Sequence, residues 1–275
     1  MPSIDLNGTA IWYSDSGGDG DVVLFHHGYT SSHDVWAPTL DRLPAGRRYI
    51  TMDARGAGDS GRPTDDSYTV DNYVADVLGL VDHLGVDTFS YVGHSMGGGI
   101  GFVLGIEHGH RLDRLILVAP IPSGGIDGNS ERRAAAEDLW ASAAEDQLVR
   151  ERLVGAARPE TADETQIKSS VGRMLSVSAG HYRQSWAEMD RFNVTDRLGE
   201  LTTETLIIAG AADGLARPNV RDYLAIPNAS LHVFNRVGHG PPTEVPDEFA
   251  AVVDDFLTNG VVTAKMLLDR IDAII

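Results

Sequence analysis

The stretch FSYVGHSMGGGIG, residues 89–101, decides the fold. Its first half is a short apolar run typical of a buried strand, and its second half opens a glycine-rich helix. Between them lies Gly-x-Ser-x-Gly, the pattern of a serine on a tight strand-to-helix turn. Such a turn forces a positive φ on the serine, and the flanking glycines remove the Cβ atoms that would collide. We therefore predict that Ser95 is a nucleophile, with the backbone N–H of Met96 facing the oxyanion.

Short β-branched runs alternate with longer helical stretches through most of the chain. Some runs are apolar on both faces, for example VVLF at residues 22–25, as in strands covered by helices on both sides of a parallel sheet. The alternation predicts an α/β fold on a mostly parallel, doubly wound sheet. Strands are expected over Ala10–Ser14, Val22–His26, Tyr49–Asp53, Phe89–Val92, Leu115–Ala119, Thr205–Ala209 and Leu231–Phe234, and helices over Val70–Leu84 and Asp247–Leu257.

Residues 121–201 depart from this alternation of strands and helices. The interval holds no convincing strand and favours helices, for example over Glu131–Glu151. We expect a helical cap at 121–201, inserted into a core formed by residues 1–120 and 202–275. Residues 261–275 predict an added amphipathic helix, for which docking on the parent domain and a homodimer contact are the alternatives.

A serine nucleophile needs a base and an acid that orients the base. His239 follows the last predicted strand in VGHG, residues 237–240, and Asp213 follows the strand before it in GAAD, residues 210–213. Both fall at the carboxyl edge of the sheet, where Ser95 is expected. Asp213 would fix the tautomer of His239 and stabilise its imidazolium. His232 lies inside a predicted strand, so a structural role is expected for it.

A second oxyanion donor is expected after the predicted strand Val22–His26. Gly28 permits a sharp turn there, and the N–H of Tyr29 would join that of Met96 across the substrate carbonyl oxygen. His26, His27 and His33 lie close together in sequence, but no carboxylate accompanies them in a metal-binding pattern. We expect them to anchor loops and predict no metal site.

Five motifs, in this order, resemble the α/β-hydrolase superfamily over nearly the whole chain. They are HG at 27–28, DARGAGDS at 53–60, GHSMGG at 93–98, Gly210 with Asp213, and GH at 238–239. The resemblance implies the α/β-hydrolase fold and a Ser-His-Asp triad that cleaves a carboxylic ester or lactone through an acyl-enzyme. The cap matches no subfamily, so the resemblance does not extend to the substrate.

Other reactions stay open on the same triad: C–C bond hydrolysis, amide hydrolysis and perhydrolysis. Serine at the turn, in place of aspartate, disfavours dehalogenases and epoxide hydrolases. A non-catalytic ligand-binding member of the fold is a further alternative, against which a complete triad argues. The expected partner is a small-molecule substrate.

Five residues are candidates for substrate binding: His94, Trp140, Met174, Tyr182 and Trp186. Tyr182 and Trp186 are four residues apart and would share one helix face. Together with Met174, Met189 and Phe192 they would line an apolar acyl or lactone pocket. The alternative is a seam that packs the cap onto the core.

The loop GAGDSG, residues 56–61, satisfies the dinucleotide pattern Gly-x-Gly-x-x-Gly. That fingerprint requires its last glycine to open a helix. Here Arg62 and Pro63 follow, in a loop, so we predict no nucleotide cofactor and expect Asp53 and Arg55 to hold the loop in place.

The composition excludes several classes. The chain has no cysteine, which removes disulfides, thiolate nucleophiles and cysteine-based metal sites. Its formal charge of −18 argues against nucleic acid and anionic membrane surfaces as partners. No segment approaches the roughly 20 apolar residues that cross a bilayer. The first residues lack the features of a secretory signal, so a cytoplasmic location is expected.

Overall fold

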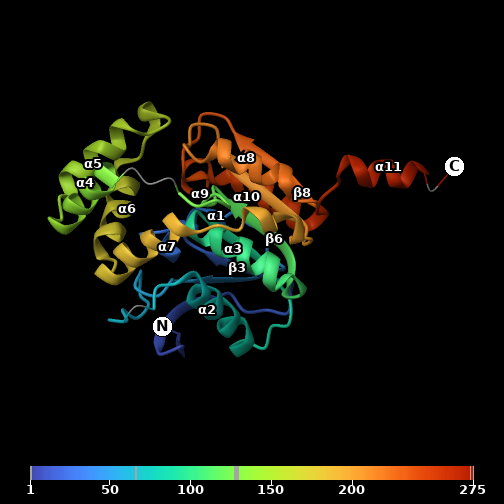
Figure 1. Cartoon of the computed structure of the whole chain (residues 1–275), viewed down its shortest axis with the longest axis horizontal. Coiled ribbons are helices and arrows are strands. Elements are labelled where there is room, and N and C mark those ends of the chain that lie inside the picture. Colours follow the sequence, from blue (N-terminus) through green and yellow to red (C-terminus); the bar gives the residue numbers. More distant parts are fainter. Residues whose placement is uncertain (1, 66, 127–129, 273, 275) are drawn as a thin grey trace.

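The computed structural model describes residues 2–65, 67–126, 130–272 and 274. Eight strands of this part form one mixed sheet in the order β1-β2-β4-β3-β5-β6-β7-β8 (Figure 1). Neighbours from β4 to β8 run parallel, whereas β1 and β2 join antiparallel at one edge. The expected α/β-hydrolase fold is confirmed. The strands are β1 (Ser3–Leu6), β2 (Thr9–Asp15), β3 (Val22–His26), β4 (Arg48–Met52), β5 (Phe89–His94), β6 (Leu112–Val118), β7 (Thr205–Gly210) and β8 (Ala229–Phe234).

Helices cover both faces of the sheet, as the doubly apolar strands require. Alternate residues of β3 show this directly: Leu24 packs in one core with α2, α3 and α8, and Phe25 packs in the other with α1 and α10. The helices are α1 (Ala37–Leu40), α2 (Val70–His83), α3 (Met96–Glu107), α4 (Ser130–Ala141), α5 (Glu145–Val154), α6 (Glu164–Ser176), α7 (Trp186–Arg191), α8 (Ala216–Ala225), α9 (Pro241–Glu244), α10 (Pro246–Asn259) and α11 (Ala264–Asp272).

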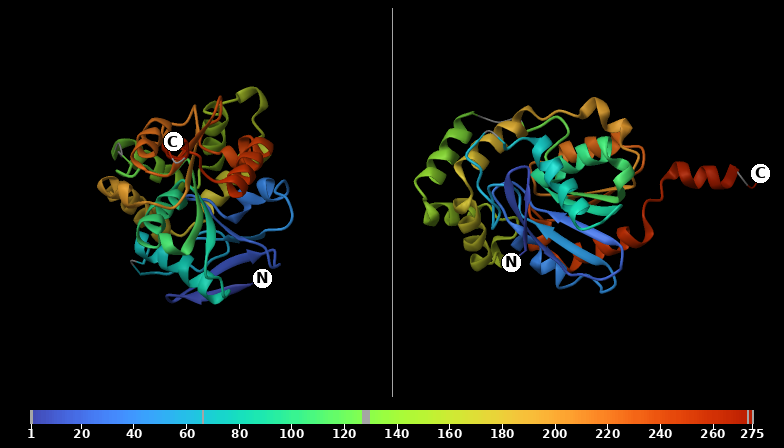
Figure 2. Two further views of the ribbon diagram at one scale, coloured as in Figure 1. Left: turned by 90° about the vertical axis from the view of Figure 1, so that its right-hand side faces the viewer. Right: turned by 90° about the horizontal axis from the view of Figure 1, so that it is seen from below.

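The residues between β6 and β7 carry helices α4 to α7 and, among those described, no strand. These helices gather at one end of the molecule (Figures 1 and 2). The helix-favouring stretch Glu131–Glu151 is divided into α4 and α5. Ala143 has φ +49° at the division, and the Ser142 hydroxyl donates back to the carbonyl of Asp138 at 2.7 Å.

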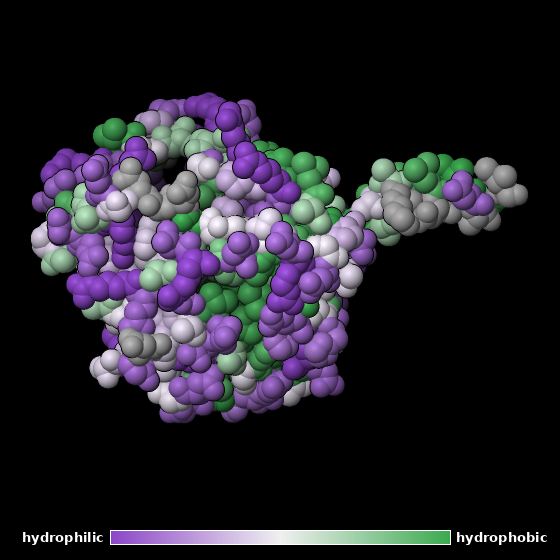
Figure 3. Space-filling model, viewed as in Figure 1, coloured by the Kyte–Doolittle hydropathy of each residue, from purple (hydrophilic) through white to green (hydrophobic). Residues whose placement is uncertain are grey.

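Helix α11 extends away from the body of the protein (Figures 1 and 2). Its apolar side chains Leu267, Leu268 and Ile271 are exposed, and they form a hydrophobic surface on the projecting arm (Figure 3). The arrangement differs from docking on the parent domain, and the homodimer contact stays a prediction. None of the helices in the described ranges has the length and apolar character that a membrane crossing requires.

Candidate active site

Ser95 lies between β5 and α3 with φ +54° and ψ −112°. Residues other than glycine rarely adopt this backbone conformation. Backbone hydrogen bonds hold it there: its N–H donates to Val118 at 2.9 Å, and its carbonyl accepts from Ile121 at 3.0 Å. A Cβ atom on Gly93 would lie 2.3 Å from the carbonyl oxygen of Gly97. The turn therefore needs glycine where the sequence has it.

The loop after β3 lies directly over this serine. A Cβ atom on Gly28 would come within 2.9 Å of the Ser95 Cβ. His27 anchors the loop, because its Nε2 accepts from the N–H of Ala54 at 3.0 Å and its Nδ1–H donates to the carbonyl of Gly28 at 2.7 Å. The loop therefore packs against Ser95 at Gly28, and the role of the next N–H, that of Tyr29, as an oxyanion donor stays a prediction.

The three residues of the predicted triad meet in one line of hydrogen bonds. The Ser95 hydroxyl donates to His239 Nε2 across 2.9 Å, and His239 Nδ1–H donates to an Asp213 carboxylate oxygen across 2.8 Å. The His239 side chain is 45% exposed, whereas Ser95 is buried. Of these two side chains, the predicted base is therefore the one that faces solvent.

Backbone hydrogen bonds between the loop after β7 and the loop after β8 hold Asp213 in place. The N–H groups of Ala211 and Ala212, just before it, donate to the carbonyls of Phe234 and Val237 at 2.9 Å each. Burial alone would raise the pKa of Asp213, but the hydrogen bond from His239 and its charge outweigh burial and lower this pKa. The group is therefore a carboxylate at neutral pH, as an acceptor for the His239 proton requires.

His94 lies behind the predicted triad rather than in an open pocket. It is buried, and its Nε2–H donates to the carbonyl oxygen of His239 across 2.7 Å. Burial and the neighbouring His239 lower the pKa of His94 to about 3, so its ring is neutral at ordinary pH.

The other four candidate substrate residues gather in the helical segment. Trp140 stacks on Tyr182 with ring centroids 4.2 Å apart, and its indole N–H donates to the carbonyl of Met174 at 3.1 Å. Tyr182 and Trp186 both contact the ring of Tyr29, with centroids 5.7 and 5.9 Å away. These contacts join the helical segment to the loop beside Ser95, as the seam alternative describes.

Arg133 belongs to this cluster although nothing in the sequence singled it out. Its guanidinium lies 4.5 Å from the ring centres of both Tyr182 and Trp186, a cation–π arrangement. It also donates to the Tyr182 carbonyl at 3.0 Å and to the Tyr29 hydroxyl at 3.5 Å. The sequence of α4 does not predict these contacts, because they form only when α4 packs against Tyr29, Tyr182 and Trp186 in the folded protein.

His33, Asp53 and Asp59 offer donor atoms within 4.8 Å of one another. The Asp53 carboxylate is already occupied by the backbone and ring N–H groups of His33, at 2.6 and 2.8 Å, and by the N–H of Asp59 at 2.8 Å. A Cβ atom on Gly58 would lie 2.2 Å from this carboxylate. The glycine-rich loop is thus shaped around Asp53, and α2 begins only at Val70.

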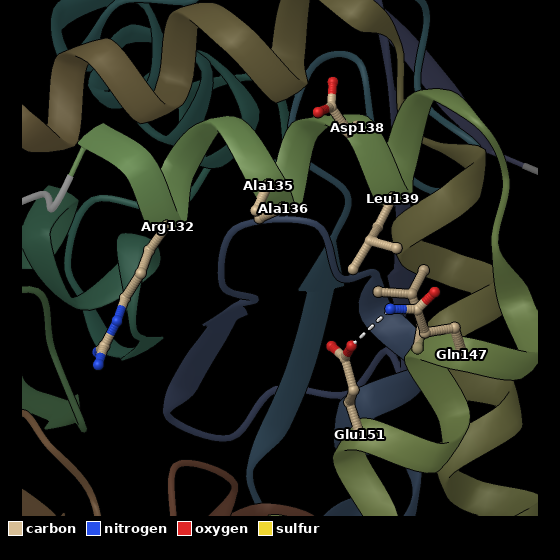
Figure 4. Close-up of a pocket in the computed structure, with 8 residues that line it drawn as sticks. Arg132, Ala135, Ala136, Asp138, Leu139, Gln147 and Glu151 are labelled. Atoms are coloured by element: carbon tan, nitrogen blue, oxygen red, sulfur yellow. Dashed lines mark hydrogen bonds between the residues drawn. The ribbon is translucent and has the colours of Figure 1, made fainter.

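A pocket of about 500 Å³ opens between α4 and α5 (Figure 4). Its polar lining includes Arg132, Asp138, Gln147 and Glu151, and none of its lining residues belongs to the predicted triad. The Gln147 amide donates to the Glu151 carboxylate at 3.0 Å across one turn of α5.

The sequence matches known proteins over most of its length. A profile of the alpha/beta hydrolase fold matches residues 21–244. A 2-hydroxymuconate semialdehyde hydrolase of Pseudomonas putida is 32% identical over 223 residues, 77% of each chain. The enol-lactonase of Burkholderia xenovorans LB400 superposes with a TM-score of 0.84 at 23% identity, covering 94% of this chain and 100% of that one. Est816, described as an N-acyl homoserine lactone degrading enzyme, gives 0.81 at 26% identity, covering 93% and 100%.

Proposed function

The chain belongs to the α/β-hydrolase-fold family, and we propose that it is a serine hydrolase that cleaves a carboxylic ester or lactone through an acyl-enzyme. The observation that carries this proposal is the unbroken line of hydrogen bonds from Ser95 through His239 to Asp213. No further group is needed to activate a hydroxyl nucleophile.

In the proposed reaction, the Ser95 oxygen attacks the substrate carbonyl while His239 Nε2 takes its proton. The N–H groups of Tyr29 and Met96 stabilise the negative charge that forms on the carbonyl oxygen. His239 then gives the proton to the leaving alkoxide, which in a lactone stays attached to the acyl group. Water activated by the neutral His239 hydrolyses the acyl-enzyme and restores Ser95.

The test compares p-nitrophenyl esters of increasing acyl length with several lactones. We expect turnover of at least one class, stoichiometric labelling of Ser95 by a fluorophosphonate, and loss of several orders of magnitude in kcat for Ser95→Ala. A rate that Ser95→Ala leaves unchanged would overturn the proposal. Folded wild-type protein that resists the fluorophosphonate would favour a non-catalytic binding role instead.

A second candidate is C–C bond hydrolysis of a substrate that carries a carboxylate. It is favoured by two arginines, Arg152 on α5 and Arg173 on α6, which have no carboxylate within 4.0 Å among the described residues. Their hydrogen bonds go to neutral acceptors instead: Ser170 and the Met174 sulfur for Arg152, and Ser169 for Arg173.

The environment of this arginine pair favours an anionic ligand. Burial lowers the pKa of both guanidinium groups, the charge of Arg173 adds to the effect on Arg152, and the charge of Asp34 only partly offsets the effect on Arg173. The charge of Arg173 also contributes to the lowered pKa of His27, beside the loop over Ser95. A substrate carboxylate would relieve this repulsion, and the name of the Pseudomonas putida relative denotes such a substrate, a muconate semialdehyde.

Paired substrates test this candidate. For Arg173→Met we expect kcat/KM to fall about 10- to 100-fold for a carboxylate-bearing substrate and to change little for its neutral methyl ester, because a charged hydrogen bond is lost only with the acid. Equal losses on both substrates would contradict recognition of an anion by Arg173.

A further inference from the structure

The loop that carries His239 is held by a single carboxylate from both sides. One oxygen of Glu244 accepts the N–H of Gly238 at 2.8 Å, and the other accepts the N–H of Gly240 at 3.0 Å. Glu244 stands on α9, one turn beyond the loop. The two backbone amides that flank His239 therefore share one acceptor group, the carboxylate of Glu244.

The carbonyl between these amides has its own partner. His94 Nε2 lies 2.7 Å from the carbonyl oxygen of His239. A carbonyl only accepts, so the proton is on this ring nitrogen. Because the ring is neutral at ordinary pH, the same tautomer can hold the carbonyl throughout the working range.

These contacts leave the backbone of His239 little freedom. Its ring must place Nδ1 against Asp213 and Nε2 against Ser95 at the same time, at 2.8 and 2.9 Å. A displacement of about 1 Å in such an arrangement can reduce a rate by about 100-fold. We propose that Glu244 and His94 are positioning residues: together they fix the backbone of His239 so that its ring stays aligned between Asp213 and Ser95. The proposal rests on the triad proposed above.

A purely structural role for Glu244 is the competing explanation. The same carboxylate accepts the N–H of Gly240, the residue before α9, at 3.0 Å and could serve only to hold the start of this helix. In that case its removal would lower the melting temperature and leave the turnover of folded molecules unchanged. The two explanations therefore differ in kcat per folded protein.

The test uses Glu244→Ala and Glu244→Gln, with Glu248→Gln as the matched control. Glu248 is an exposed glutamate four residues further along, on α10. The glutamine keeps one acceptor oxygen and loses the other, so we expect kcat to fall about 10-fold for Glu244→Gln and about 100-fold for Glu244→Ala, with KM within about twofold. The control should match the wild type.

A second pair of variants tests His94 and does not depend on Glu244. His94→Gln keeps an N–H donor near the position of Nε2, whereas His94→Leu removes it. We expect His94→Gln to retain most of the activity and His94→Leu to lose at least about 10-fold in kcat. The low-field NMR signal of the His239 Nδ1 proton should persist in His94→Gln and broaden in His94→Leu.

The rate of Ser95 labelling by a fluorophosphonate separates the possible failures. Wild-type protein that is not labelled would refute the proposed triad itself. If the wild type is labelled, and folded Glu244→Ala and His94→Leu are labelled and turn over substrate at the wild-type rate, the positioning role is overturned. It is also overturned if KM rises while kcat is unchanged, or if Glu248→Gln loses as much as Glu244→Gln.

Discussion

Gly210 lies so close to Gly238 that a Cβ atom on it would come within 2.0 Å of the Gly238 carbonyl oxygen. The contact joins the end of β7 to the loop that carries His239. Since Asp213 follows Gly210 by three residues, the same contact helps to hold the proposed acid near the proposed base. Backbone packing therefore acts together with the hydrogen bond between Asp213 and His239.

Gly210→Ala should therefore separate Asp213 from His239. We expect kcat to fall by at least about 10-fold and the free energy of unfolding to fall by about 1–3 kcal/mol, the usual effect of overpacking. Gly214→Ala in the same loop is the control, because a Cβ atom there has no neighbour within 4 Å. Steady-state kinetics and urea unfolding measure the two effects, and similar behaviour of both variants would contradict this view.

A methyl group on Gly28 should obstruct the serine. Its Cβ atom would lie 2.9 Å from that of Ser95, so the loop must move and carry the N–H of Tyr29 with it. Loss of one oxyanion donor lowers kcat by about 100- to 1,000-fold, and we expect a loss of that order for Gly28→Ala. Gly199→Ala, at a position with open space, should keep wild-type kinetics. Full activity in Gly28→Ala would show that the oxyanion lies elsewhere.

Much of this site could be predicted from the sequence because its parts are local. The turn at Ser95 has no room for Cβ atoms at the flanking positions, so glycines occur there in the sequence. The carboxyl ends of neighbouring parallel strands must also meet at one edge of the sheet. Other parts had no local signal. Strand β1 (Ser3–Leu6) is short and half-exposed at the sheet edge, and the division after α4 depends on a positive φ at Ala143, a residue type that does not favour one.

The contact made by His94 could not be predicted from the residues near it in sequence. His94 is a candidate for contact with substrate in the sequence, whereas in the structure its Nε2–H donates to the carbonyl of His239, a residue far along the chain. Glu244 likewise left only a weak sign, a glutamate shortly after His239. Both contacts require the three-dimensional arrangement of β5 and the loop after β8.

The buried ion pair of Arg55 and Asp76 should matter far more for stability than the exposed pairs. Two hydrogen bonds of 2.8 and 2.6 Å join these fully buried groups. Arg55→Met would leave the buried Asp76 carboxylate without its cation, and we expect it to cost about 3–5 kcal/mol of unfolding free energy. Arg197→Met, which breaks exposed ion pairs with Glu107 and Glu200, should leave the unfolding free energy close to that of the wild type. Equal costs in urea unfolding would contradict the prediction.

Acid should weaken the fold through its buried histidines. Burial lowers the pKa of His26 and His181 from 6.5 to about 3. Between these values the unfolded chain binds more protons than the folded one, so the unfolding free energy falls as the pH drops. Each histidine contributes about half of ~1.4 kcal/mol per pH unit near pH 6.5 and approaches the whole of it at lower pH.

Urea unfolding between about pH 7 and about pH 5 measures this slope. His181→Gln should lower the unfolding free energy at neutral pH, because it changes contacts with Tyr73 and Arg55. It should also reduce the slope of unfolding free energy against pH by the contribution of one histidine. A slope identical to that of the wild type would show that His181 does not titrate on unfolding.

The helical segment leaves the sheet after β6 and returns to it before β7. These strands are neighbours with an unbroken register from Leu115 opposite Thr205 to Val118 opposite Ile208. The two points of attachment are therefore set by the sheet and do not depend on what lies between them. Evolution can lengthen, shorten or replace the segment without disturbing the register, so new substrate preferences can arise while the hydrolytic chemistry is inherited intact.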